Sequence, residues 1–336
     1  VPLLILLSII TCPYLTCTWE DQGVKCRVIT PALRPFSFRA TARNCSIMAL
    51  TCVLALSGCG LRIGEGTRAS LPTLSASQQT QDALARRTAL INSAAQLLAK
   101  SGSAEVAAVA KGSAIQLRSL GGVWQPWHTT PPTGYPTVSP VPTAGSDTTT
   151  AQLVMYLKQG TGEALKAATE SSGKTAQTYA AIGLTWASWA RALDGTNFDK
   201  LMALQPRTSV NLTTPLQAST LNAYDQARYG LEVIAAQSGD DATGAQAKAA
   251  AATVDACLAV KCPDQRLSSY QLPSGNSYEQ GASLWLNVVS AELSEVANAK
   301  DEAQRKQAIS AGAWALVQAQ SWNASLTQTE QALGVK

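Results

Sequence analysis

Histidine is almost missing from this chain of 336 residues: the only one is His128, and it lies in a proline-rich stretch. A zinc site of the Cys/His type needs several such ligands, and a Ser-His-Asp triad would here have one candidate base. The chain also lacks a Walker-type phosphate loop, a GxSxG turn and an HExxH helix. We therefore predict no catalytic residue and no cofactor.

Clustered positive charge is lacking as well. Charged residues make up 14% of the chain, and its formal net charge is +4. Most of that excess lies before residue 59, which leaves the remainder of the chain near neutral. Because phosphate neutralisation needs clustered Lys and Arg, we exclude nucleic acid as a partner. The charges before residue 59 are Lys25, Arg27, Arg34, Arg39 and Arg43 against Glu20 and Asp21.

Long apolar runs are also absent, but a short one precedes a cysteine. The run from Ala49 to Leu56 is too short to cross a bilayer and suits the middle of a secretory signal. The order Leu56-Ser57-Gly58-Cys59 resembles the lipobox of bacterial lipoproteins. That resemblance implies a Cys59 thiol acylated with chains such as palmitate, which becomes the new amino terminus. The alternatives are an ordinary signal peptide and a buried apolar helix with a chance cysteine.

This interpretation assigns residues 1–58 to a signal peptide with an upstream extension, since a start at Val28 would leave a leader of normal length. A membrane segment in the first fifteen residues is the alternative, which their small number and Pro13 disfavour. Residues 59–74 then form the lipidated cysteine and a flexible tether. We expect the mature protein at the cell membrane, lipid-anchored on its extracytoplasmic face.

Only two cysteines follow Cys59, and both lie near the expected end of one helix. Outside the cytoplasmic membrane, Cys257 and Cys262 could form a disulfide if the helix ended near Lys261, which Pro263 favours. The alternative is two small buried thiols. Neither has a further Cys or a His nearby, so we predict no zinc site.

The composition after Cys59 is that of an all-α protein. Helices are expected over residues 75–100, 103–120, 149–171 and 174–193, with Ser75 as a helix cap. They would form an N-terminal antiparallel bundle, residues 75–200, interrupted by a proline-rich loop, residues 121–147. In that loop, Trp124, Trp127 and Tyr135 either form an interaction surface or cover the end of the bundle.

A second set of helices is expected over residues 216–237, 242–260, 277–299 and 301–332, forming a four-helix bundle of residues 215–334. Thr214-Pro215 is expected to open it as a cap followed by proline. The stretches LNAYDQARYGLEVIAA, SSYQLP, ASLWLNVVSAELSEVANA and ISAGAWALVQAQSW resemble an actinobacterial family of exported proteins with a ferritin-like domain of unknown function. The resemblance implies a ferritin-like bundle and no established activity.

Ferritin-like topology raises the question of a dimetal centre. Such a centre uses a Glu from each of two helices and a Glu-x-x-His motif from each of the other two. Here the candidate carboxylates are Asp225, Glu232, Glu292 and Glu295, and no histidine accompanies them. A standard di-iron oxidase is excluded. A carboxylate metal site with non-standard ligands stays open as a weaker alternative, and our primary prediction is no metal.

Glu292 falls on the apolar stripe of its helix, between Trp285, Val289 and Val296. A buried carboxylate must be paired, hydrogen-bonded or protonated. Arg228 interrupts the apolar face of the first helix of the set, and we predict a buried ion pair between Glu292 and Arg228.

Two functional hypotheses follow. The first is a lipid-anchored protein without enzymatic activity that binds an unidentified protein, cell-envelope component or small apolar ligand. The second is a ferritin-like enzyme with an unusual carboxylate metal site. We prefer the first.

The lipid anchor is directly testable. We predict that mass spectrometry of the native amino terminus will find Cys59 as the first residue, carrying a thioether-linked diacylglycerol. Recovery of the native chain from the cytosol, unlipidated and with its leader intact, would contradict the prediction.

Overall fold

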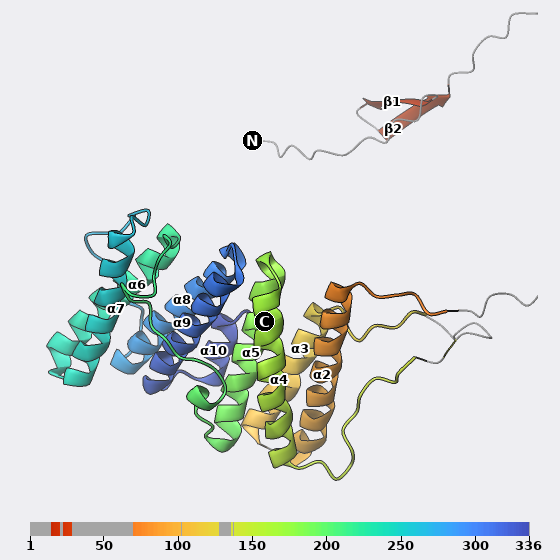
Figure 1. Cartoon of the computed structure of the whole chain (residues 1–336), viewed down its shortest axis with the longest axis horizontal. Coiled ribbons are helices and arrows are strands. Elements are labelled where there is room, and N and C mark those ends of the chain that lie inside the picture. Colours follow the sequence, from red (N-terminus) through yellow and green to blue (C-terminus); the bar gives the residue numbers. More distant parts are fainter. Residues whose placement is uncertain are drawn as a thin grey trace, which may run out of the picture. The chain divides into compact units, whose positions relative to one another are not determined.

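The computed structural model describes residues 15–20, 23–28, 70–101, 103–127, 136 and 138–335 (Figure 1). The chain divides into two compact units, residues 1–66 and 67–336. In the first, strands β1 (Leu15–Glu20) and β2 (Gly23–Val28) pair as an antiparallel hairpin in which Cys17 lies opposite Cys26. The predicted lipobox and Cys59 lie outside the described residues.

The second unit is all-α, as the composition predicts. Its α-helices among the described residues are α2 (Ala76–Leu98), α3 (Ala104–Ser119), α4 (Thr150–Glu170), α5 (Gly173–Asp194), α6 (Ala218–Ser238), α7 (Asp241–Ala259), α8 (Ser277–Asn298), α9 (Glu302–Ser321) and α10 (Leu326–Ala332). Two short 3-10 turns, η1 (Ala99–Ser101) and η2 (Phe198–Lys200), follow α2 and α5.

Helix ends follow local chemistry in most places. Ser75 caps α2 in a reciprocal capping box with Gln78. Two expectations differ from the structure. Helix α6 begins after Gln217 rather than at Thr214-Pro215. The single helix expected over residues 301–332 is divided into α9 and α10, because Asn323 between them takes a positive φ of 58°.

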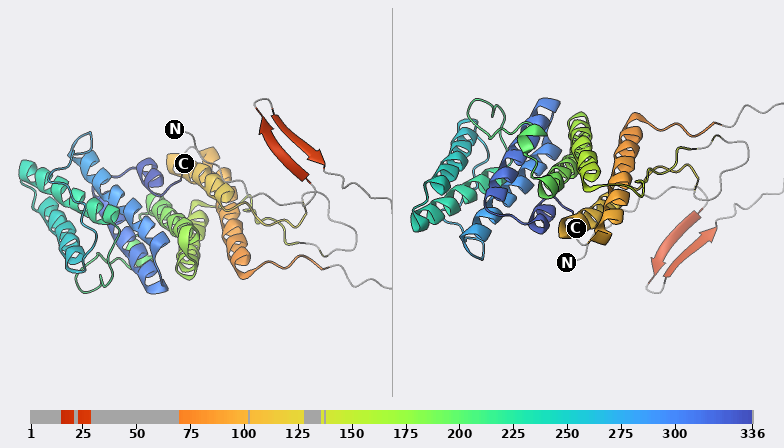
Figure 2. Two further views of the ribbon diagram at one scale, coloured as in Figure 1. Left: turned by 90° about the horizontal axis from the view of Figure 1, so that it is seen from above. Right: turned by 90° about the horizontal axis from the view of Figure 1, so that it is seen from below.

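Antiparallel hairpins are the building unit of residues 67–336: α2 packs on α3, α4 on α5, α6 on α7 and α8 on α9. Contacts between hairpins arrange them in two layers, α2-α4-α9-α7 and α3-α5-α8-α6. Figure 1 shows the hairpins in a row, with α6/α7 at one end, then α8/α9, α4/α5 and α2/α3. Figure 2 shows the same row from above and below.

Each set of four helices contains one long connection. Trp285 of α8 donates to Gln246 near the start of α7, while Arg207 contacts both Glu292 of α8 and Thr253 of α7, so α7 and α8 run in the same direction. Residues 260–276 therefore return the chain along the bundle. The first set repeats this order, because α3 and α4 both lie antiparallel to α2 and residues 120–149 connect them.

The second hairpins of the two sets, α4/α5 and α8/α9, are related by one offset in the sequence. Leu165 in α4 and Leu293 in α8 are 128 residues apart (293 − 165), as are Trp186 in α5 and Trp314 in α9. Each leucine contributes to the core, and each tryptophan packs within its own set. The division into bundles of residues 75–200 and 215–334 stays a prediction, since both sets belong to one compact unit with a continuous core.

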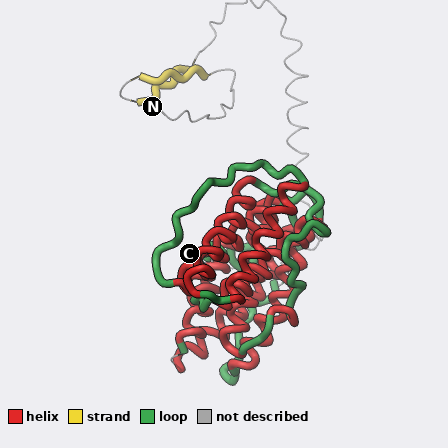
Figure 3. The backbone as a smooth tube through the Cα atoms, turned by 90° about the vertical axis from the view of Figure 1, so that its left-hand side faces the viewer, coloured by secondary structure: helices red, strands yellow, loops and turns green. Residues whose placement is uncertain are grey.

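The core is closely packed because small residues let helices approach. Trp186 and Trp189, three residues apart in α5, are both fully buried, as their spacing predicts. Gly160 lies against the ring of Trp186, and Gly281 lies against the ring of Trp322. Helix axes share one general direction in the view of Figure 3.

Close packing at Gly281 gives a stability prediction. A Cβ there would overlap the ring of Trp322, which is held by a hydrogen bond of 2.7 Å from its Nε1 to Gln246 Oε1. Gly281→Ala should lower the free energy of unfolding by about 1–3 kcal/mol through overpacking. Gly244→Ala in α7 is the matched control: no atom lies within 4 Å of its added Cβ, and the change should stabilise by up to about 1 kcal/mol. Urea unfolding followed by circular dichroism measures both, and equal effects would contradict the packing argument.

Candidate functional site

Glu292, expected on the apolar stripe of its helix and partly buried, is fully buried, and its cationic partner is Arg207 rather than Arg228. Arg207 Nη2 lies 2.6 Å from Glu292 Oε2, and Arg207 Nε donates to Oε1 over 3.0 Å. Tyr224 of α6 donates its hydroxyl to the same Oε1 over 2.8 Å. The carboxylate is thus satisfied by a bidentate guanidinium and a phenol.

The predicted pairing with Arg228 is wrong because local partners occupy that side chain. Arg228 Nε donates to Asp225 and its Nη1 donates to Glu232, at spacings of three and four residues along α6. Such neighbours share one helix face. The position on α6 that faces Glu292 is that of Tyr224, one turn earlier.

Arg207 comes from the loop between α5 and α6 and connects that loop to several helices. It is 3% exposed. Its Nη1 donates to Gln307 of α9 over 2.8 Å, and its carbonyl oxygen accepts from the Thr253 hydroxyl of α7 over 2.9 Å. Gln307 in turn donates to the carbonyl of Asn211 in the same loop. The ion pair therefore fixes the loop against α7, α8 and α9.

The protonation states of this cluster follow from burial and charge. Burial alone would lower the pKa of Arg207, but the Glu292 carboxylate raises it above its ordinary value. Burial, and then the charge of Glu292, raise the pKa of Tyr224 well above 10.0. Arg207 stays a cation and Tyr224 stays a neutral donor across the physiological range.

Glu295, one turn further along α8, caps α6 from outside that helix. Its Oε1 accepts from the Gln217 N–H over 2.7 Å and from the Thr220 hydroxyl over 2.6 Å. A carboxylate at a helix amino terminus is favoured by the unpaired amides there, which accounts for Gln217, rather than Thr214, as the cap residue of α6. Burial raises the pKa of Glu295, although these two hydrogen bonds act to lower it.

The four carboxylates of the weaker metal hypothesis do not converge. Asp225 accepts from Arg228 and from the Tyr270 hydroxyl, while Glu232 is about half exposed and bound to the same Arg228. Glu292 and Glu295 are engaged as described above. No group of three His, Cys, Asp or Glu suited to a metal ion occurs in the described part of the chain. The non-standard metal site at these residues is therefore not supported.

The remaining predicted residues lie elsewhere. A disulfide joins Cys257, in the last turn of α7, to Cys262, which follows the end of that helix, and their Cα atoms are 5.3 Å apart. Trp124 and Trp127 are both half-buried, and the Trp124 N–H donates to Asp82 of α2 over 2.7 Å. Tyr135 lies outside the described residues, so the interaction surface of these three aromatics stays a prediction.

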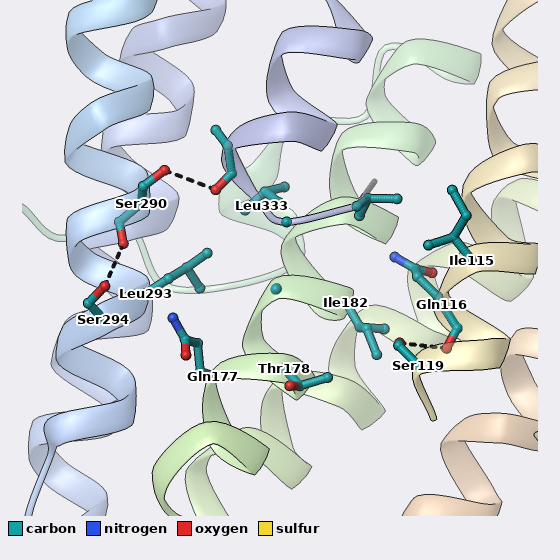
Figure 4. Close-up of a pocket in the computed structure, with 14 residues that line it drawn as sticks. Ile115, Gln116, Ser119, Gln177, Thr178, Ile182, Ser290, Leu293, Ser294 and Leu333 are labelled. Carbon is teal, nitrogen blue, oxygen red and sulfur yellow. Dashed lines mark hydrogen bonds between the residues drawn. The ribbon is translucent and has the colours of Figure 1, made fainter. Parts of the chain in front are cut away.

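A cavity of about 450 Å³ lies where the first helix set meets the second (Figure 4). Its walls come from α3, α5 and α8, with the chain after α10 as the fourth side. The apolar side chains of the lining are those of Ile115, Ala181, Ile182, Leu293, Ala332, Leu333 and Val335. A volume of this size is typical of sites for small organic molecules.

Gln116 of α3 is the buried polar group of this cavity. It is 3% exposed, and its Oε1 accepts from the Trp186 indole N–H over 2.8 Å. Its Nε2 is buried and has no hydrogen-bond partner in the described structure. Figure 4 shows the amide nitrogen on the cavity side, toward the walls formed by Leu293 and Leu333. Gln116 is not among the residues predicted from the sequence.

The hydroxyl groups of the lining are not activated. Ser119 donates to the carbonyl of Gln116, Ser290 to that of Ala332, and Ser294 to that of Ser290. The lining includes no Asp, Glu, His, Lys, Arg, Cys or Tyr. Without a base, none of these hydroxyls is a nucleophile at neutral pH. The lining thus combines apolar walls with amide and hydroxyl groups and contains no general base.

Comparisons with known proteins add no assignment: no family model, curated protein or solved structure matches the chain. Of the helices that the structure describes, none combines the length and apolar character needed to cross a bilayer.

The two neighbouring carboxylates should respond differently to neutral substitution. Glu292→Gln leaves the buried Arg207 without its counter-ion, which should lower the free energy of unfolding by about 3–5 kcal/mol at pH 7. Glu295→Gln retains an oxygen that can accept both hydrogen bonds, so it should not lower the free energy of unfolding. Urea unfolding of both variants measures the contrast, and similar losses in the two would contradict this account.

The pH dependence of the free energy of unfolding supplies a second test of Glu295. Because the pKa of Glu295 is raised in the folded state, that state binds the proton more tightly than the unfolded chain does. Stability therefore falls as pH rises from about 4.5 through the raised pKa and then levels off. Glu295→Gln should remove this fall, so its stability relative to the parent should increase with pH. An unchanged profile would contradict the assignment.

Proposed function

We propose that this chain is a lipid-anchored extracytoplasmic protein that binds a small ligand in the cavity between its two helix sets. The observation that carries the proposal is the cavity lining, which combines apolar walls with one buried unpaired amide and no titratable side chain. Selective pockets are lined by apolar groups with a few placed polar ones. We propose no enzymatic activity, and the anchor at Cys59 rests on the lipobox alone.

The ferritin-like assignment of α6–α9 is part of the same proposal. It is supported by the parallel pair α7/α8 and the long connection of residues 260–276, because ferritin-like bundles carry one long crossover. Binding of a further protein or cell-envelope component, through Trp124 and its neighbours, also stays a proposal.

Filling the cavity tests the binding function. We predict that the full chain carrying Cys59→Ser, which lacks the acylated thiol, binds the neutral dye Nile red saturably. Ala181→Trp places a large ring in the cavity, where it would occupy the space that the dye needs. Binding should weaken by about tenfold or more, which corresponds to a loss of at least about 1.4 kcal/mol. Fluorescence titration measures the affinity.

Thr175→Trp is the matched control, since Thr175 is an exposed residue of the same helix and does not line the cavity. Its affinity should equal that of the parent. Equal affinity of the Ala181→Trp variant, or a lack of saturable binding in the parent, would overturn the proposed function.

A further inference from the structure

The orientation of the Gln116 amide is fixed by its buried neighbour. The indole N–H of Trp186 is a donor only, and it reaches Gln116 Oε1 over 2.8 Å. Rotating the amide by half a turn would place the NH₂ group against the indole N–H, two donors facing each other. Trp186 is fully buried, with its ring close to Gly160. The NH₂ group is therefore directed away from the indole, and Figure 4 shows it on the cavity side.

An amide nitrogen held in this way is unsatisfied in the protein alone. Its two hydrogens lie in a buried position, and no described group accepts them. A buried donor without a partner costs roughly 1–3 kcal/mol, and native structures rarely contain one without a reason. The side chain points into a cavity large enough for a ligand, which supplies that reason.

The rest of the lining restricts the charge of such a ligand. None of its residues carries a charge, so the lining offers no counter-ion to an anion or a cation. The serine hydroxyls that have been described already donate to carbonyl oxygens, which leaves Gln116 as the buried donor free to act. Gln177 of α5 is a second carboxamide in the lining, half-buried and not held by any described hydrogen bond.

From these contacts we infer that the cavity selects uncharged, largely apolar molecules that present a hydrogen-bond acceptor, a ketone, ester or ether oxygen, to Nε2 of Gln116. The inference rests on the proposed binding function and specifies its ligand class. Gln116 is a specificity residue in this account, and Trp186 is the group that sets its orientation.

The test uses three simple probes with the full chain carrying Cys59→Ser: octan-2-one, octane and octanoate. In ¹⁵N-labelled protein, octan-2-one should shift the side-chain NH₂ resonances of Gln116, and octane should not. The ratio of ketone affinity to alkane affinity is the quantitative readout, because it removes the shared apolar contribution. Octanoate should bind more weakly than the ketone, since its charge would have no partner.

Two variants isolate the amide. Gln116→Met combined with Trp186→Phe removes the donor without leaving the indole N–H unpaired, and should lower the ketone-to-alkane ratio roughly fivefold, the factor that corresponds to one hydrogen bond. Trp186→Phe alone frees the amide to rotate but keeps the NH₂ group, so it should lower the ratio by less than the double variant does, and the difference between the two isolates the donor. Gln177→Met tests the other carboxamide and should keep the ratio within about twofold of the parent, well below the effect of losing one hydrogen bond.

The outcomes are distinguishable. If octane and octan-2-one bind but the ratio is unchanged in the double variant, the ligand class is wrong while the binding function stands. A fall in the ratio for Gln177→Met would place the donor on that residue and also overturn the inference. If no probe binds, the proposed function fails and the inference fails with it.

Discussion

The ion pair between Arg207 and Glu292 is the interaction on which the second helix set depends. Its charges are buried, so neither can lose its partner without leaving the other unsolvated. Tyr224 of α6 donates a further hydrogen bond to the Glu292 carboxylate. Thr253 of α7 and Gln307 of α9 bond to Arg207, so one cluster fixes the loop that carries Arg207 against α6, α7, α8 and α9. The same loop joins the two helix sets, so this cluster anchors the connection between them to the second set.

Packing on two sides is the second constraint. Helices α4, α5, α8 and α9 lie in the middle of the row and have neighbours on both sides, so small residues occupy positions where helices meet. Gly183 lies against Leu165, and Gly312 approaches the Cβ of Glu292. Close approach of this kind brings helices together without voids. In α9 it also blurs the amphipathic pattern, because most of that helix is buried on both faces and has no solvent stripe.

Local signals predicted the helices better than their partners. The cap at Ser75 and the double glycine after α3 are short-range features, and the structure places helix ends there. The partner of Glu292 could not be found in this way, because Arg207 lies 85 residues away in a loop without periodicity. The break before α10 depends on Asn323 in a left-handed conformation, which a sequence without glycine there does not indicate. Gln116 could have been recognised, since it follows Val109 and Ser113 on the buried face of α3.

The position of the cavity follows from these two constraints. In ferritin-like proteins, metal ligands occupy the interior between facing helices, but here the corresponding interior of the second set is filled by the Arg207 cluster and by tryptophans. Within each set, helices pack closely at small residues such as Gly160 and Gly281. The junction between the sets is different, because there α5 and α8 come from separate hairpins and α3 and the chain after α10 close the sides. Space and an unpaired donor are therefore found where the two sets meet, and a ligand bound there would contact both.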